Sequence, residues 1–412
     1  MAKRPMRFIH AADLHLERPP HGLDEAPDHL RARLIDAPFT AAERIFDAAV
    51  SESVDFVILA GDVMHVELAG PRGVVFLIEQ FERLAKHGID VYWCGGQVDA
   101  HEHWPRSIRL PDNVHVFGTA EVPYFEARRG DETIARLSAW SRATAKKHRA
   151  SDLDADTSEV FTIAVAHGRF ERPMLVDADI DYWALGGAHA RDTLVSSPSV
   201  AHYPGTPQGR SHDENGPHGA TLVRVDAQGE AHLSFVAANS LQWHDERIAV
   251  ERIATREALH RALAERTSEL LAAAQGADLL VRWTLSGNGP LTGSVGRRSL
   301  AAEVQSQLRR DYGHRPHTAW ATAVEVEAPT ALHDDLYEQD SILGGFLRSV
   351  RQHQANGAPV ADLRIEEYLG SFHAGGALAE AVRLDDDETR MRVLRKAAIL
   401  GADLLAGEES HS

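Results

Sequence analysis

The sequence predicts a layered α/β domain, followed by a small second α/β domain and a C-terminal helical segment. Residues 6–240 alternate short β-rich runs with amphipathic helical stretches, which is typical of a layered α/β fold. From about residue 246 the order becomes strand, helix, strand, helix, strand, as in a separate small domain. The length of 412 residues also suits two or three domains. We therefore divide the chain into domains at 1–245, 246–329 and 330–412.

The first domain is expected to contain seven strands and two helices. Thr40 and Glu43 form a capping-box pattern, and apolar residues follow at helical spacing, which predicts a helix over 40–53. A second helix is predicted over 74–86, with Gly88 closing it. The strands are predicted from apolar and β-rich runs at 7–11, 54–60, 89–93, 161–166, 182–185, 220–226 and 231–236.

The rest of the chain is expected to hold a small mixed domain and a final helix. Strands are predicted at 246–253, 279–285 and 318–326, with helices at 256–274 and 299–310. The acidic C-terminal segment contains a predicted helix over 389–405, whose apolar stripe comprises Met391, Leu394, Ala398 and Leu405. We interpret the stripe as a face packed on its own protein, with a partner-binding face as the alternative.

Composition excludes several classes of protein. The formal charge of −18 argues against a basic surface that coats nucleic acid, because such binding needs clustered Lys and Arg. The single cysteine, Cys94, lies in an apolar run, so we expect a buried side chain and neither a disulfide framework nor a thiolate metal site. The N-terminal apolar run is too short for a secretory signal, and no run approaches the roughly 20 apolar residues of a membrane span. We expect a soluble cytoplasmic protein.

Acidic and histidine side chains follow four of the predicted strands. Asp13 and His15 follow the first strand, Asp62 the second, and His167 and His189 follow two later ones. The carboxyl ends of parallel strands meet at one edge of a sheet, where ligands gather. Two residues apart in extended chain, Asp13 and His15 would point to the same side. Asp and His without Cys suit a hard divalent ion such as Mn²⁺, with Fe²⁺ or Zn²⁺ as alternatives.

The order D-x-H, G-D, a turn in the place of G-N-H-D, H-G and G-x-x-H resembles the calcineurin-like metallophosphoesterases. More narrowly, the chain resembles the SbcD-type DNA repair exonucleases, including their YhaO-like branch. The segment YPGTPQGRSHDENG at 203–216, the β-α-β-α-β unit and the C-terminal helix extend this resemblance over nearly the whole chain. The resemblance implies a four-layer β-sandwich flanked by helices, a small α+β capping domain and a C-terminal segment that docks on an ATPase.

The same resemblance implies a site for one or two ions, with Mn²⁺ expected first. The first ion would be held by Asp13, His15, Asp62 and His189. The second would be held by Asp62, Gln97 and His167, and by a histidine where this chain has Gly187. The second site is therefore expected to be degenerate, since one ligand is lengthened and another is lost.

Catalysis is implied for Asp62, His167 and His189. Val98 stands where the family has a histidine that contacts the phosphate or protonates the leaving group. Since the loss of a general acid typically costs about 10² to 10⁴ in rate, we expect reduced activity. His65, His101 and His103 lie nearby and are candidates to compensate, with solvated loop residues as the alternative. Arg210 is expected to position a loop or to contact phosphate.

The resemblance implies a metal-dependent phosphodiesterase, specifically a DNA repair exonuclease or endonuclease subunit that hydrolyses DNA with metal-activated water. The implied partners are DNA, a second copy of the chain, and an SbcC-like ABC ATPase with a coiled coil. Two alternatives stay open. The chain could be a catalytically impaired scaffold or DNA-sensing subunit, or a phosphoesterase that acts on a small nucleotide.

Overall fold

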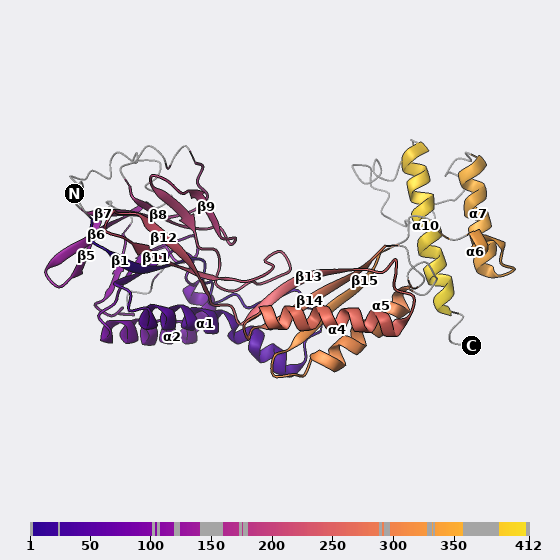
Figure 1. Ribbon diagram of the computed structural model, residues 1–412, viewed down its shortest axis with the longest axis horizontal. Helices are drawn as coiled ribbons and strands as arrows, with labels where there is room; N and C mark the ends of the chain where they lie inside the picture. The colour runs from indigo at the N-terminus through magenta and orange to yellow at the C-terminus, as the bar shows by residue number, and fades with distance from the viewer. Residues whose placement is uncertain are drawn as a thin grey trace. The chain divides into compact units, whose positions relative to one another are not determined.

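The computed structural model describes residues 3–23, 25–100, 104, 108–118, 124–140, 160–172, 175, 180–287, 291, 297–327, 332, 334–356 and 387–408. Two compact units divide the chain (Figure 1). The first comprises residues 1–244 with 271–280, and the second comprises 245–270 with 281–412. The division into three domains stays a prediction, and the two units are described separately below.

Two six-stranded mixed sheets form the first unit. One contains β1 (Met6–Ala11), β2 (Phe56–Ala60), β3 (Asp90–Cys94), β4 (Val114–Val116), β11 (Gly219–Val225) and β12 (Ala231–Ala237), in the order β12-β11-β1-β2-β3-β4. The other contains β5 (Tyr124–Arg129), β6 (Glu132–Trp140), β7 (Phe161–His167), β8 (Tyr182–Gly186), β9 (Asp192–Val195) and β10 (Val200–Tyr203), in the order β5-β6-β7-β8-β10-β9. Strands β1 to β3 run parallel, as do β7 and β8, so their carboxyl ends can share one site.

Successive residues of the central strands face two different cores. On β1, Ile9 packs into the core beneath helices α1 (Asp28–Ser51) and α2 (Val66–Lys86), which lie side by side in Figure 1. Its neighbour Phe8 faces the second sheet instead, where it stacks on Phe56 of β2. This period of two is the pattern of a strand buried on both faces. The mixed α/β sandwich with helices outside it confirms the predicted fold class.

The first helix begins earlier than predicted, so the capping-box interpretation of Thr40 is wrong. Pro27 is the residue before the helix and makes no side-chain capping bond. Leu30 and Leu34 are buried and extend the apolar face toward the N-terminus. Pro38 lies inside the helix. Because proline normally breaks a helix, the sequence did not predict the turns that precede Pro38. Helix α2 likewise begins at Val66, before the predicted residue 74, and is kinked at Gly70.

The second unit follows the predicted order of elements closely. Its three-stranded sheet has the order β13-β14-β15. The elements are β13 (Leu241–Ala249), α4 (Arg256–Ala273), β14 (Asp278–Ser286), α5 (Arg297–Tyr312), β15 (Ala319–Val326), α6 (Asp334–Glu338), α7 (Ile342–Asn356) and α10 (Asp387–Glu408). Leu394 and Ala398 of α10 pack against Leu347 of α7, which confirms that the apolar stripe packs on its own protein. Among the described helices, none combines the length and apolarity needed to cross a bilayer.

Candidate metal centre

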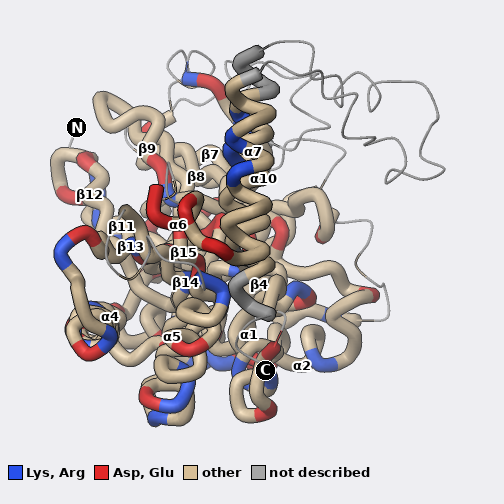
Figure 2. The backbone as a smooth tube through the Cα atoms, turned by 90° about the vertical axis from the view of Figure 1, so that its right-hand side faces the viewer, with Lys and Arg blue, Asp and Glu red and all other residues tan. Residues whose placement is uncertain are grey.

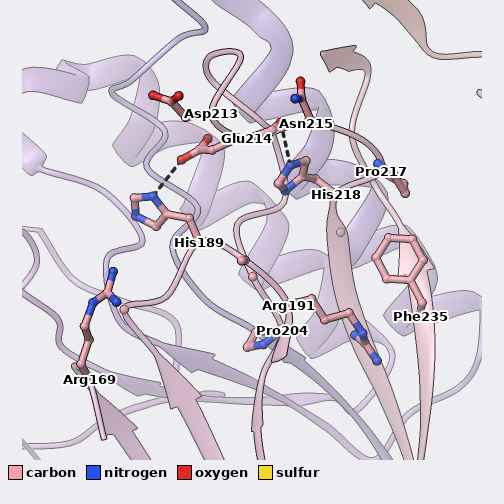
Figure 3. Close-up of a pocket in the computed structure, with 14 residues that line it drawn as sticks. Arg169, His189, Arg191, Pro204, Asp213, Glu214, Asn215, Pro217, His218 and Phe235 are labelled. Carbon is pink, nitrogen blue, oxygen red and sulfur yellow. Dashed lines mark hydrogen bonds and ion pairs between the residues drawn. The ribbon is translucent and has the colours of Figure 1, made fainter. Parts of the chain in front are cut away.

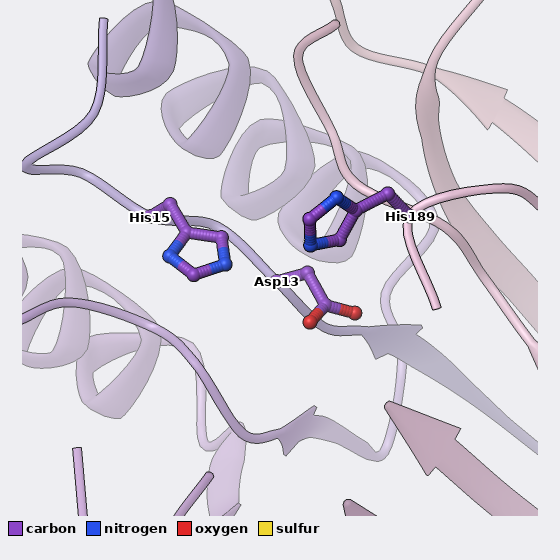
Figure 4. Close-up of side chains that lie close together, drawn as sticks. All are labelled: Asp13, His15 and His189. Atoms are coloured by element: carbon purple, nitrogen blue, oxygen red, sulfur yellow. The ribbon is translucent and has the colours of Figure 1, made fainter. Parts of the chain in front are cut away.

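Five side chains meet where the parallel strands of the two sheets end. Asp13 and His15 follow β1, Asp62 follows β2, His167 ends β7, and His189 follows β8. Metal-binding atoms of Asp13, His15 and His189 lie within 4.8 Å of one another (Figure 4). Those of Asp13, Asp62 and His167 satisfy the same limit. Asp13 belongs to both groups, so the five side chains form one continuous cluster.

Three of these residues have a left-handed backbone, with φ of 54° at Asp13, 43° at His15 and 53° at Asp62. This conformation costs about 1 to 2 kcal/mol for a residue with a side chain. Backbone hydrogen bonds hold it, from Asp13 N–H to Gly61 O at 3.0 Å and from His15 N–H to Asp62 O at 3.1 Å. The prediction that Asp13 and His15 lie in extended chain and point to the same side for that reason is therefore wrong. Tight turns bring the two side chains together.

The turn after β3 fixes the carboxylate of Asp62. The backbone N–H groups of Gln97 and Val98 donate to Asp62 Oδ1, with N···O distances of 2.5 and 3.0 Å. Asp62 Oδ2 is left to face two histidines, 3.3 Å from His167 Nε2 and 3.7 Å from His15 Nε2. One oxygen of Asp62 is thus held by main chain, and the other is presented to the cluster.

The buried carboxylate of Asp99 holds this turn in place. Asp99 Oδ1 accepts from the backbone N–H of Asp62 at 2.9 Å and of Gly96 at 2.6 Å. Asp99 Oδ2 accepts from Val63 N–H at 3.0 Å and from Trp93 Nε1–H at 2.8 Å. A Cβ at Gly96 would fall 2.3 Å from Asp62 Oδ1, so the close approach requires glycine. Asp99 was not predicted as a site residue, although it occupies the last position of the altered turn motif.

Each histidine of the cluster fixes its ring through Nδ1. The partners of Nδ1 are Glu17 Oε1 at 3.2 Å for His15, Ala60 O at 2.8 Å for His167, and Glu214 Oε1 at 2.8 Å for His189. Within the described chain, Nε2 of His15 and of His167 is buried and has no hydrogen-bond partner. Buried polar atoms normally have partners, and metal-binding histidines characteristically bond a carboxylate or carbonyl through their other nitrogen. The residues therefore fit a divalent cation.

Asp62 and His167 form a tightly coupled pair. Burial alone would lower the pKa of His167, but the carboxylate of Asp62, with Oδ2 3.3 Å from His167 Nε2, outweighs burial and raises this pKa to about 9. Burial would likewise raise the pKa of Asp62, but His167 and the backbone N–H of Val98 hold it well below its usual range. A cation bound by these atoms would take the place of the shared proton.

Two further carboxylates, Glu17 and Glu214, orient histidines and were missed in the sequence. The Glu17 side chain is 0% exposed and also accepts from the backbone N–H of His65 at 3.0 Å. Glu214 accepts from Arg210 Nη2 at 2.9 Å, and these contacts outweigh burial and keep the pKa of Glu214 well below its usual range. The alternation of acid and histidine at 13, 15 and 17 was the signal for Glu17. Buried Arg210 positions Glu214 and His189.

The residues at the altered positions take no side-chain part in the cluster. Gln97 is exposed, and its backbone N–H, not its amide, is the group bonded to Asp62. Gly187 has a φ of 94°, and a Cβ there would lie 2.9 Å from Gly168 N, so a histidine would be strained. The backbone N–H of Gly187 instead donates to Asp13 at 2.9 Å.

Only one of the three candidate compensating histidines falls in the described part of the chain. His65 stands at the start of α2, linked to the cluster through Glu17, and its Nδ1 is buried without a partner among the described residues. His101 and His103 lie outside the described residues. His65 is thus the candidate whose position can be assessed.

Comparison with known proteins agrees with this geometry. The calcineurin-like phosphoesterase profile matches residues 6–189, and the profile of the middle domain of metallophosphoesterase YhaO matches residues 243–329. The uncharacterized metallophosphoesterase YhaO of Bacillus subtilis (strain 168) is 30% identical over 364 residues, which cover 84% of this chain and 87% of that protein.

Two archaeal proteins show weaker similarity. The DNA double-strand break repair protein Mre11 of Aeropyrum pernix is 24% identical over 249 residues, 55% of this chain and 59% of that protein. The Mre11 of Archaeoglobus fulgidus is 32% identical over 94 residues, 23% of this chain and 19% of that protein. With the YhaO match spanning most of both proteins, the chain belongs to the calcineurin-like metallophosphoesterases of the YhaO type.

Proposed function

We propose that this metallophosphoesterase is a phosphodiesterase that cleaves DNA, as an exonuclease or endonuclease subunit in DNA repair. One observation carries the proposal: in the described part of the chain, Nε2 of His15 and of His167 is buried without a hydrogen-bond partner beside the carboxylates of Asp13 and Asp62. A purely structural cluster would satisfy those nitrogens internally. The two relatives named as DNA double-strand break repair proteins support DNA as the substrate.

We propose Mn²⁺ as the cation, because the donors are carboxylates and imidazoles without thiolate. Asp13, His15, Asp62 and His189 would hold one ion, and His167 with Asp62 and Asp13 would hold a weaker second one. A bound divalent cation supplies positive charge for the phosphate oxygens and makes water more acidic. The protein's own contribution is to keep Asp62 aimed and the three imidazole rings oriented.

The leaving-group oxygen needs a proton, and Val98 has none to give. Any side-chain donor must therefore come from another position, and His65 is the described candidate because its Nδ1 is buried and unpartnered. Water is the alternative donor. In either case we expect slower turnover than in an enzyme with histidine at position 98, by about 10² to 10⁴.

We also propose a homodimer that works with an SbcC-like coiled-coil ABC ATPase. Supporting this, Val393, Leu400 and Leu404 of α10 are 38%, 51% and 51% exposed, on a helix whose other face is already packed. Figure 2 shows Lys and Arg interspersed with Asp and Glu over the described part of the chain, which suits a protein that shares DNA binding with a partner.

A second candidate function is a scaffold or DNA-sensing subunit without catalysis. The specific observation in its favour is Gly187, because its φ of 94° and its close neighbours disfavour any side chain that could bind a second ion. Such a subunit would keep the fold and one structural ion.

Hydrolysis assays with metal counting separate the two candidates. Purified protein would be given Mn²⁺ with an aryl phosphodiester or with linear duplex DNA, beside Asp62→Asn and the exposed control Asp112→Asn. Activity that is lost in Asp62→Asn and kept in Asp112→Asn supports the enzyme. One bound ion with no hydrolysis, also after addition of the partner ATPase, would establish the scaffold instead.

A further inference from the structure

A cavity of about 450 Å³ opens beside the metal centre (Figure 3). Gly187 and His189 line the cavity and also belong to the centre, through the Gly187 bond to Asp13 and the position of His189 in the cluster. The volume lies within the usual range for small-molecule sites, which is about 300 to 1,000 Å³. A group held in this cavity would therefore be adjacent to any phosphate at the centre.

Two arginines of the cavity, Arg169 and Arg191, carry charge that no carboxylate of the described residues compensates. Arg169 is exposed, and Arg191 donates to the hydroxyl of Thr221. In the described parts of the chain, neither guanidinium pairs with a carboxylate. Other surface arginines do, as with Arg129 and Asp55. In a chain of formal charge −18, two unpaired guanidiniums on one cavity indicate an anionic ligand.

An aromatic ring, Phe235, lies beside Arg191 (Figure 3). Phe235 on β12 is 42% exposed and lies opposite Thr221 of β11 in the sheet. The Arg191 guanidinium sits 5.5 Å from the centre of this ring. A half-exposed ring beside unpaired cations is the combination that binds single-stranded nucleic acid, because bases stack on the ring while cations hold the phosphates.

The acidic groups of the cavity lie apart from these arginines. Figure 3 shows Asp213 and Glu214 on the other side of His189 from Arg169 and Arg191. The charge of Glu214 is already engaged by His189 and Arg210. Because the carboxylate of Glu214 is paired, the positive charges of Arg169 and Arg191 would draw an incoming anion to their part of the cavity.

We propose that this cavity holds the nucleotide next to the scissile phosphate in a single DNA strand, with Phe235 stacked on its base, Arg191 on its phosphate and Arg169 on a neighbouring phosphate of the strand. The assignment rests on the proposed function, because Gly187 and His189 connect the cavity to the centre. A free nucleoside monophosphate offers the same chemistry, so the experiment must distinguish a strand from a free nucleotide.

Binding without metal tests the site independently of hydrolysis. Fluorescent tetrathymidylate would be titrated at low salt in EDTA against the wild type, Arg169→Gln, Arg191→Gln, Phe235→Leu and the control Arg261→Gln, an exposed arginine of α4. We expect roughly tenfold weaker binding for each arginine variant, and a similar loss for Phe235→Leu. A tetramer of abasic sites should lose nothing further in Phe235→Leu. Arg261→Gln should stay within twofold.

Arg169→Gln is the decisive variant, because Arg169 is exposed and forms no ion pair or hydrogen bond with the described residues. Equal binding by Arg169→Gln and Arg261→Gln would overturn the assignment, as would no measurable binding by the wild type. If thymidine monophosphate binds as tightly as the tetramer, the ligand of this cavity is a free nucleotide, and the assignment to a DNA strand is wrong. Normal tetramer binding with no hydrolysis of any substrate would refute the proposed function while supporting this site.

Discussion

Replacing Asp99 by Asn tests whether one buried carboxylate holds the turn that aims Asp62. The carboxylate accepts two N–H groups on each oxygen. An amide has one acceptor oxygen, so two of those donors would face an NH₂ group, whichever way the side chain is turned. With about 1.5 kcal/mol for each hydrogen bond to a charged group, local opening of the turn should become easier by about 3 kcal/mol.

Cys94 provides the assay, because it is the only cysteine of the chain and ends the strand that leads into this turn. Its side chain is buried, and burial, assisted by the charge of Asp99, raises the pKa of the thiol to about 12. Labelling by a disulfide reagent therefore requires local opening. A change of about 3 kcal/mol corresponds to labelling about 100-fold faster. Labelling through the open state should show the pH dependence of an ordinary thiol in both proteins.

The exposed Asp112 provides the matched control, since Asp112→Asn makes the same chemical change away from the turn. We expect its labelling rate to stay within twofold of the wild type. If Asp99→Asn is labelled at less than three times the wild-type rate, the turn is held by something other than Asp99, and the reasoning fails.

Three other predictions concern the centre itself. Glu17→Gln should weaken Mn²⁺ binding about 10- to 100-fold by calorimetry, because His15 loses its carboxylate partner; unchanged affinity would contradict the role of Glu17. Because the folded pKa of His167 is raised to about 9, its proton stabilises the fold fully below about pH 6.5, and this stability is lost as pH rises through 9. Urea unfolding in EDTA should therefore show a loss of about 3 kcal/mol between those pH values, absent in His167→Asn. Gly187→His should lower the melting temperature without adding a bound ion, and a gain of one ion by metal counting would refute the strain at Gly187.

The residues that end parallel strands were predictable from the sequence. Asp13, Asp62, His167 and His189 each follow an apolar run, and parallel strands in one sheet must end at the same edge. The structure brings all four together with His15. The resemblance implies Asp62 as the ligand shared by both ions, whereas Asp13 is the residue common to the two groups of donors. This difference depends on turn geometry that no periodicity encodes.

The supporting carboxylates were harder to identify. Glu214 meets His189 across 25 positions, and Asp99 meets Asp62 across 37. Both contacts depend on how loops from different strands approach one another, and single-sequence patterns report only local spacing. Short strands were missed for a related reason. β4 has three residues, all half-buried, so it shows neither an unbroken apolar run nor a clear alternation.

Positions 98 and 187 differ in how readily each could accept a functional side chain. The turn after β3 positions Asp62 with main-chain N–H groups, which are present whatever side chains stand at positions 97 and 98. Val98 is not among the residues with positive φ, so a proton-donating side chain could stand there while the architecture stays intact. Gly187 is different, because its φ of 94° and its close neighbours disfavour any side chain. A donor at position 98 needs only a new side chain, whereas a ligand at position 187 would require the loop after β8 to be rebuilt.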